Sequence, residues 1–413
     1  MFIAGTALFV FSSLACAMAS SRGMLLGARA LQGFGGAILS PATLSILTSS
    51  FKEGPERNRA LGTWGAMGAL GASSGALLGG FLTQGLGWPA IFAVNVPIGL
   101  FVIFYGLQVI PASQASEGKR HFDVAGAVLV TTSLMLVTFA IVRTDTLGWA
   151  SLGVLAPLLA GIALGLAFLF VEARIAAVPL VRLGIFRTGQ LRIANGVVIL
   201  LYAAFFPVWF FLTLYMQQVL HYDAIETGLL FLPMTLSIFA ASKLAPRLLA
   251  RFAARRVITT GMLTATLGMG LLTGVAPHAG YLTTVLPGAT LAALGMGLSL
   301  VPATIVAMQG LAPSESGLGS GLLNTSRLIG GALGLAILST IADAQTRHDV
   351  AGGFAGSLTS GFDLAFAVGA GFCLAGAALA GLLLRSAPRS EVLAAPAEEP
   401  LVEVESEREA LAA

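Results

Sequence analysis

The chain has 413 residues, of which 56% are hydrophobic and only 10% are charged, and its mean hydropathy is +0.90. Soluble domains carry about 25% charged residues, and a water-soluble fold has no way to hide this much apolar surface. The composition therefore excludes a soluble protein and indicates that lipid is the main solvent.

Apolar stretches of membrane-spanning length recur along the chain. Each is long enough to cross about 30 Å of hydrocarbon, which takes about 20 helical residues. We predict an all-α integral membrane protein with about twelve transmembrane helices, at residues 2–20, 25–50, 58–82, 89–110, 124–142, 150–171, 193–216, 226–249, 257–275, 282–308, 317–341 and 364–385.

Lysine and arginine are distributed unevenly between alternate loops. If the C-terminus is cytoplasmic, the cytoplasmic loops hold thirteen of these residues, and the opposite loops hold only Arg22, Arg143 and Arg347. Positively charged loops tend to stay in the cytoplasm. We therefore expect a multi-pass protein of the plasma (inner) membrane with both termini cytoplasmic.

The two ends of the sequence differ from its middle. Met1 leads directly into the first apolar run without a basic segment, so this run is not a signal peptide. We interpret this start as the middle of a longer design. Residues 386–413 are rich in Ala, Pro and Glu, and we expect them to form a disordered acidic cytoplasmic tail.

Only two charged residues lie deep in the predicted spans, Arg29 and Arg327. Such a residue costs about 2.5–3.5 kcal/mol on insertion scales and is a functional candidate by default. Arg29, Gln32 and Gly33 share a helical face by their spacing. We predict that the Arg29 guanidinium is buried in a cavity. The alternative is an arginine that snorkels to the surface, and it fits less well because Arg29 follows Arg22 by seven residues.

A stripe of glycines runs along the third predicted span. Gly71, Gly75 and Gly79 recur every four residues, and Gly80 follows them. Small residues at this spacing let two membrane helices approach closely. The stripe therefore indicates a tightly packed helix contact, either a generic one or one with a transport role.

In the eleventh predicted span, Asn324 and Arg327 are three residues apart and share a face. They would either line a polar cavity or stabilise a contact between helices. The sequence leaves both interpretations open.

A possible substrate cavity lies around the seventh and eighth predicted spans. Phe206, Trp209 and Phe210 would line an apolar site, although aromatic residues in membrane helices are more often simply packed. Gln217 and Glu226 lie near the following outward loop. Glu226 would attract cations at a cavity mouth, or complement the dipole of the helix that it begins, and we favour the second interpretation.

No enzymatic machinery is visible in the sequence. All four histidines map to loops, and there is no HExxH motif, nucleophile elbow or P-loop. We expect a protein that is not an enzyme and that needs neither a cofactor nor a metal.

Three motifs carry a resemblance to a known family. The run Arg29–Ala37 resembles the RxxQGxGxA motif in the fourth helix of major facilitator superfamily transporters. The run Gly71–Gly80 resembles the antiporter motif GxxxGPxxGG of the fifth helix. The run Trp88–Gly99 is similar to the WRWIFxxNVPIG stretch that follows it.

Further stretches resemble the EmrB/QacA drug-resistance branch of this superfamily, namely Tyr215–Val219, Gly228–Pro233 and Gly321–Gly334. That branch has fourteen helices, and the first helix here matches the third of the branch, so the first two helices are missing. The resemblance implies four remaining helices of the N-terminal bundle at 1–110, two linking helices and a cytoplasmic loop at 111–190, a six-helix C-terminal bundle at 191–385, and the tail. The acidic residue of the branch's first helix lies outside the chain, and we expect no deep carboxylate in any span.

The resemblance also implies a function. It is that of a secondary active transporter that exports small amphipathic compounds, such as drugs and antibiotics, by proton antiport with alternating access. The proton gradient drives it, and Arg29, Gln32, Gly33, Asn324 and Arg327 would serve coupling and transport. Its partners are a small-molecule substrate, protons and the lipid bilayer, without nucleic acid, and we expect a monomer. The alternatives are a dedicated exporter of one endogenous metabolite, an uptake permease, and a truncated membrane protein that does not transport.

Overall fold

The computed structural model describes residues 1–51, 54–110, 123–175, 189–277, 279–309, 311, 315–349 and 353–384. Within these ranges the chain forms helices and short connections, and no strand occurs among the described residues. The first half contains α1 (Phe2–Ala17), α2 (Arg22–Ser50), α3 (Pro55–Leu86), α4 (Ala90–Ala93), α5 (Asn95–Val109), α6 (Val124–Leu147) and α7 (Leu152–Arg174). The second half contains α8 (Gly189–Leu214), the π-helix η2 (Tyr215–Val219), α9 (Ala224–Leu230), α10 (Leu232–Leu249), α11 (Ala254–Leu272), the π-helix η3 (Tyr281–Val285), α12 (Leu286–Met308), α13 (Ser316–His348) and α14 (Gly353–Leu383).

The apolar runs of the sequence coincide with these helices. Within the part of the chain that the structure describes, 9 helical segments are long and apolar enough to cross a membrane. The predicted spans at 2–20, 58–82 and 257–275 are also helical, as α1, α3 and α11, but they lie outside those nine. The prediction of an all-helical membrane fold is confirmed.

One predicted boundary is wrong, and its correction matters for the chemistry. The last span was expected to begin at residue 364, whereas α14 begins at Gly353. The polar residues Ser357, Thr359 and Asp363 obscured this start in the sequence. Asp363 therefore lies within α14, whose residues 353–383 are long and apolar enough to cross a membrane, and not in the loop before it. The expectation that no span holds a deep carboxylate stays a prediction.

The second half of the chain forms a bundle with a continuous apolar core. Glycines let its helices approach closely. Gly268 of α11 faces Ala292, and Gly295 of α12 faces Ala265, so that a methyl group at either glycine would collide with the opposite backbone. The contact between α8 and α13 is built in the same way, with Gly330 on Ile199.

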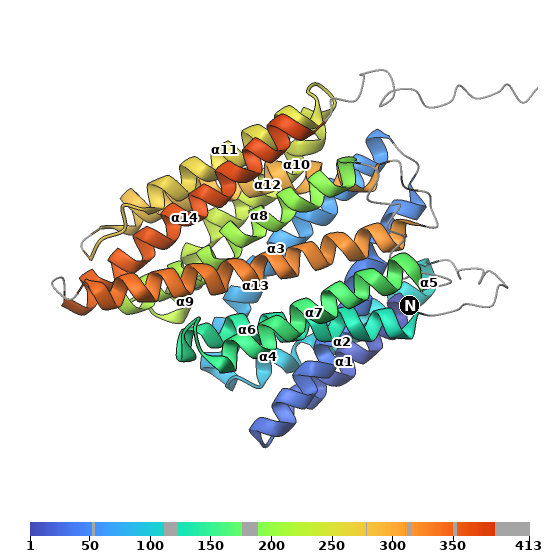
Figure 1. Ribbon diagram of the computed structural model, residues 1–413, viewed down its shortest axis with the longest axis horizontal. Coiled ribbons are helices and arrows are strands. Elements are labelled where there is room, and N and C mark those ends of the chain that lie inside the picture. Colours follow the sequence, from blue (N-terminus) through green and yellow to red (C-terminus); the bar gives the residue numbers. More distant parts are fainter. Residues whose placement is uncertain are drawn as a thin grey trace, which may run out of the picture.

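Helix α13 lies between the other helices of the second half of the chain and several helices of the first half. Figure 1 shows α8, α10, α11, α12 and α14 on one side of it and α1, α2, α6 and α7 on the other. It packs on α8 and α14, and also on α2 and α6. Helix α3 packs mainly on α10 and α12 and makes few contacts with α2. The predicted division into bundles and linking helices stays a prediction. The predicted tail and residues 111–122 and 176–188 lie outside the described residues.

Candidate transport pathway between the bundles

Two hydrogen bonds join α2 to α13. The hydroxyl of Ser40 donates to Oδ1 of Asn324 at 3.0 Å, and the hydroxyl of Ser320 donates to the backbone carbonyl of Pro41 at 3.1 Å. All four residues are at least partly buried. Asn324 therefore takes part in a contact between helices, and the prediction that it lines a polar cavity stays a prediction.

Arg327 connects α13 to three other helices. Its guanidinium carbon lies 4.7 Å from the ring centroid of Trp64 in α3 and 5.9 Å from that of Tyr202 in α8. One of its terminal nitrogens donates to the Thr304 hydroxyl of α12 at 3.2 Å. Its Nε is buried without a hydrogen-bond partner. Because cation–π contacts reach about 2 kcal/mol or more when they are desolvated, the two rings provide much of the stabilisation that this charge needs.

Two further polar contacts bind α3 to the second half of the chain. Lys243 Nζ of α10 donates to the Thr63 hydroxyl at 2.7 Å, and the Arg57 guanidinium donates to the backbone carbonyl of Met308 at 3.5 Å. Together with the Ser40–Asn324, Ser320–Pro41 and Arg327–Trp64 contacts, they form a set that we call the cross-bundle latch. Its members lie toward the C-terminal ends of α2, α10 and α12 and the N-terminal ends of α3 and α13.

Arg29 has a different environment from the one predicted. Its side chain is exposed rather than buried. It donates to Oε1 of Gln32 at 2.5 Å and lies 5.5 Å from the ring centroid of Phe92. Gln32 is only 3% exposed, and its Nε2 donates to the Ser13 hydroxyl of α1 at 2.6 Å. The polar chain from Arg29 therefore runs into the α1–α2 contact, whereas Gly33 on the same helix is exposed.

The glycine stripe of α3 does not form the predicted tight contact in this structure. A methyl group at Gly71, Gly75 or Gly79 would meet nothing within 4 Å. Gly80 alone approaches a neighbour, since a Cβ there would lie 3.4 Å from the backbone carbonyl oxygen of Ala224. The stripe is thus an uncovered face of small residues.

The aromatic residues predicted for a substrate cavity divide between packing and exposure. Trp209 packs on Phe231 with ring centroids 4.6 Å apart, whereas Phe206 and Phe210 are 50% and 44% exposed. Gln217 is exposed as well. These side chains do not enclose a common cavity in the structure.

Glu226 is a helix cap. Its backbone N–H donates to Oδ1 of Asp223 at 2.7 Å, and the Asp223 N–H donates to Oε2 of Glu226 at 3.0 Å. This reciprocal pair is a capping box at the start of α9. It supports the dipole interpretation of Glu226 and corrects its assignment to a cavity mouth.

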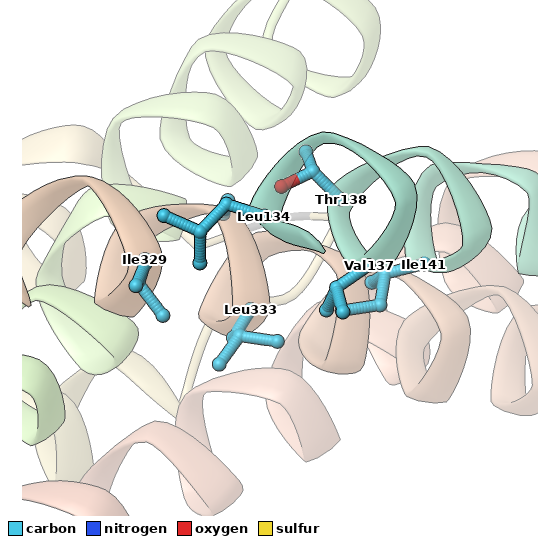
Figure 2. A pocket seen from close by; sticks show the side chains of 7 residues that line it. Leu134, Val137, Thr138, Ile141, Ile329 and Leu333 are labelled. Atoms are coloured by element: carbon cyan, nitrogen blue, oxygen red, sulfur yellow. The ribbon is translucent and has the colours of Figure 1, made fainter. Parts of the chain in front are cut away.

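An apolar pocket lies between α6 and α13, outside the predicted site. Figure 2 shows Leu134, Val137, Thr138 and Ile141 of α6 facing Ile329 and Leu333 of α13. The space in it that a water-sized molecule can occupy is about 20 Å³, whereas drug-sized ligands occupy pockets of about 300–1,000 Å³. It is therefore a packing gap between two helices rather than a substrate site.

The partners of Arg327 were not predicted from the sequence. Trp64, Tyr202 and Thr304 are single polar or aromatic residues inside apolar runs, and nothing in their spacing points to Arg327. Only the packing of α3, α8 and α12 around α13 brings them together. For Asp363 the sequence does carry a signal of its place inside a helix, because apolar residues flank it on both sides. The predicted span nevertheless begins one residue after it, at residue 364.

The described residues form an all-helical membrane fold in which polar contacts join α2 and α3 to α10, α12 and α13. The family model of the Major Facilitator Superfamily matches residues 1–335. The chain belongs to that superfamily.

Curated relatives carry names of exporters and resistance proteins. The chain is 39% identical to the cephamycin export protein CmcT of Amycolatopsis lactamdurans, over 84% of this chain and 72% of that protein. It is 35% identical to the puromycin resistance protein pur8 of Streptomyces alboniger, over 84% and 69%. It is 32% identical to the multidrug resistance protein Stp of Mycobacterium tuberculosis, over 83% of this chain and 63% of that protein.

Solved structures share the fold at low sequence identity. The human organic anion transporter MFSD10 (TETRAN) matches with a TM-score of 0.64 and 15% identity, over 92% of this chain and 76% of that one. An auto-inhibited POT family peptide transporter matches with a TM-score of 0.55 and 18% identity, over 94% and 82%. These likenesses bear on the fold alone.

Proposed function

We propose that this protein exports small amphipathic compounds, such as drugs or antibiotics, from the cytoplasm by proton antiport. The observation that carries the proposal is its similarity to an export protein and two resistance proteins over 83–84% of its length. In this proposal it lies in the plasma membrane as a monomer with both termini cytoplasmic.

The cross-bundle latch supports alternating access as the mechanism. Superfamily members of this kind move one bundle against the other around a central site. In the predicted orientation, every latch contact lies in the cytoplasmic half of the membrane. The structure is therefore closed on that side, and breaking these contacts would open the path to the cytoplasm.

The finer assignment to the fourteen-helix EmrB/QacA branch is also part of the proposal. The uncovered glycines of α3 and the exposed Arg29 support it, because an open stripe of small residues and an exposed arginine on a membrane helix call for covering helices. Two further helices packed on α2 and α3 would supply that cover and would bring the acidic residue of the branch's first helix toward Arg29.

A second candidate is a dedicated exporter of one endogenous metabolite. It is favoured by one observation, namely that the relative with 39% identity is named for export of cephamycin. Both candidates share the same fold and latch, so only substrate breadth separates them.

The test is drug susceptibility in a bacterial strain without its own efflux pumps. Expression of the chain should raise the inhibitory concentration of ethidium, puromycin or a cephamycin, and a protonophore should abolish ethidium efflux. Protection against a cephamycin alone would favour the dedicated exporter. Absence of protection and efflux for all three compounds, with the protein present in the membrane, would overturn the proposal and favour a protein that does not transport.

A further inference from the structure

Asp363 is a carboxylate inside the last membrane helix. It lies ten residues after Gly353, the first residue of the 31-residue helix α14. At 1.5 Å per residue, it is about 15 Å along a helix of about 46 Å. The hydrocarbon is about 30 Å thick, so Asp363 lies roughly 7 Å inside its boundary when α14 is centred in the bilayer. In the predicted orientation this is the outer half of the membrane.

The surroundings of Asp363 are apolar on the side of the bundle core. Its neighbours Phe362 and Phe366 are each 2% exposed, and their rings lie 5.4 and 6.0 Å from that of Phe211 in α8. The carboxyl oxygen Oδ1 of Asp363 is buried and has no hydrogen-bond partner. A buried polar atom without a partner costs about 1–3 kcal/mol, and more when it is charged.

The hydroxyl of Tyr215 lies within electrostatic range of Asp363. Tyr215 cannot solvate the carboxylate, because its proton is shared between the backbone carbonyls of Ala276 and Ala279, both at 2.9 Å. Tyr215 also begins the π-helix η2, and such irregular turns occur frequently at functional sites.

No cation among the described residues neutralises Asp363. On α13, Arg347 is paired with Asp343 at 2.5 Å, and His348 is at the helix end. The basic residues of α8 and α11 lie at the opposite end of the bundle from Asp363. They are Arg192 in α8 and Arg255 and Arg256 in α11. An ionised Asp363 would thus be an uncompensated charge in a membrane helix, which is rare and marks proton relays when it occurs.

We propose that Asp363 binds and releases a proton in the C-terminal bundle, and that this proton is one that the transport cycle carries inward. The step forms one O–H bond on the carboxyl group of Asp363, with hydronium in the outer water as proton donor, and breaks that bond when the proton passes to water on the inner side. The inference rests on the proposed proton-coupled export, and the position of Asp363 in the outer half fits proton entry from outside.

The test measures the proton directly. We expect infrared difference spectra of the full chain in detergent to show a protonated carboxylic C=O band that disappears as the pH is raised. Asp363→Asn should remove this band, Asp363→Glu should keep a titrating band at a shifted frequency, and Asp343→Asn on α13 should leave it unchanged. A spectrum of Asp363→Asn identical to the wild type would overturn the proposal. If Asp363→Asn does not fold, an unshifted band in Asp363→Glu would overturn it.

Transport separates this inference from the proposed function. In proteoliposomes with an imposed pH gradient, Asp363→Asn should slow ethidium export by roughly tenfold or more, as expected for loss of a group that carries the coupled charge. Wild-type rates in this variant would show an exporter that does not use Asp363, which overturns the inference alone. If wild type exports nothing, the proposed function fails, while the infrared band still decides whether Asp363 holds a proton.

Discussion

The guanidinium of Arg327 lies over the indole ring of Trp64, with 4.7 Å between its central carbon and the ring centroid. These residues belong to α13 and α3, which are separated by more than two hundred residues of sequence. The contact places a half-buried charge in the interface that would open in the proposed alternating access. A cation held by an aromatic ring is a reversible closure, because its stabilisation of about 0.5–2 kcal/mol is small enough to be overcome by substrate or proton binding.

Removing the indole should loosen this interface. We expect Trp64→Leu to increase maleimide labelling of a Ser45→Cys reporter, which lies on α2 opposite Gly317 of α13. A loss of about 0.5–2 kcal/mol corresponds to about a 2- to 30-fold higher population of the open form. The native Cys16 and Cys373 are fully buried and give a low background.

The matched control is Trp149→Leu, which removes a partly exposed indole between α6 and α7. It should leave the labelling rate of the reporter unchanged. Equal labelling in the Trp64→Leu variant and the wild type would show that the ring does not hold the interface closed.

The hydrogen bond between Ser40 and Asn324 should appear as a coupling energy. We expect Ser40→Ala and Asn324→Ala each to lower the free energy of unfolding in detergent by about 0.5–1.5 kcal/mol. The double variant should cost little more than either single variant, because both remove the same bond. Ser326→Ala, whose partner Asn195 lies in α8, should add independently. Strict additivity of the first pair would mean that the bond contributes nothing.

The sequence predicted the helices well because hydropathy acts locally. A membrane helix satisfies its own backbone groups, so each apolar run of about 20 residues specifies an element without help from distant residues. The errors came where polar residues lie inside a span. The last predicted span begins at residue 364, directly after Asp363, whereas α14 begins ten residues before Asp363, at Gly353.

The candidate site was less predictable, because its parts come from different helices. Arg327 and Asn324 stood out by their residue types, but their partners Trp64 and Ser40 did not. Arg29 was expected to be buried because of its depth in the span, and its exposure reflects the open face of α2 and α3 rather than any local feature. Burial of a membrane residue depends on which helices pack against it, and one helix's sequence does not contain that information.

Two glycine substitutions should have opposite effects on stability. Gly334→Ala in α13 would drive a methyl group into the backbone of Ala203 in α8, so we expect it to cost about 1–3 kcal/mol. Gly75→Ala in α3 meets open space, and the higher helix propensity of alanine should make it neutral or stabilising by up to about 1 kcal/mol. Thermal unfolding of the two variants in detergent provides the comparison.

The Gly75 variant also reports on the uncovered face. If the native protein has further helices that cover the stripe, Gly75→Ala should destabilise that longer protein in its membrane. The same substitution should leave the stability of the purified 413-residue chain unchanged. Destabilisation of the purified chain itself by Gly75→Ala would contradict the open geometry of α3.

The capping box of α9 should separate a structural role from a transport role. Asp223→Ala removes the side chain that accepts from the Glu226 N–H, so we expect it to lower the free energy of unfolding by about 0.5–2 kcal/mol. Glu226→Gln keeps the capping geometry, because glutamine also serves at this position, and removes only the charge. It should leave both stability and ethidium efflux near the wild-type values. A large loss of efflux in Glu226→Gln at unchanged stability would contradict the assignment of Glu226 as a cap alone and would return it to the substrate path, because this variant differs from the wild type only in the negative charge.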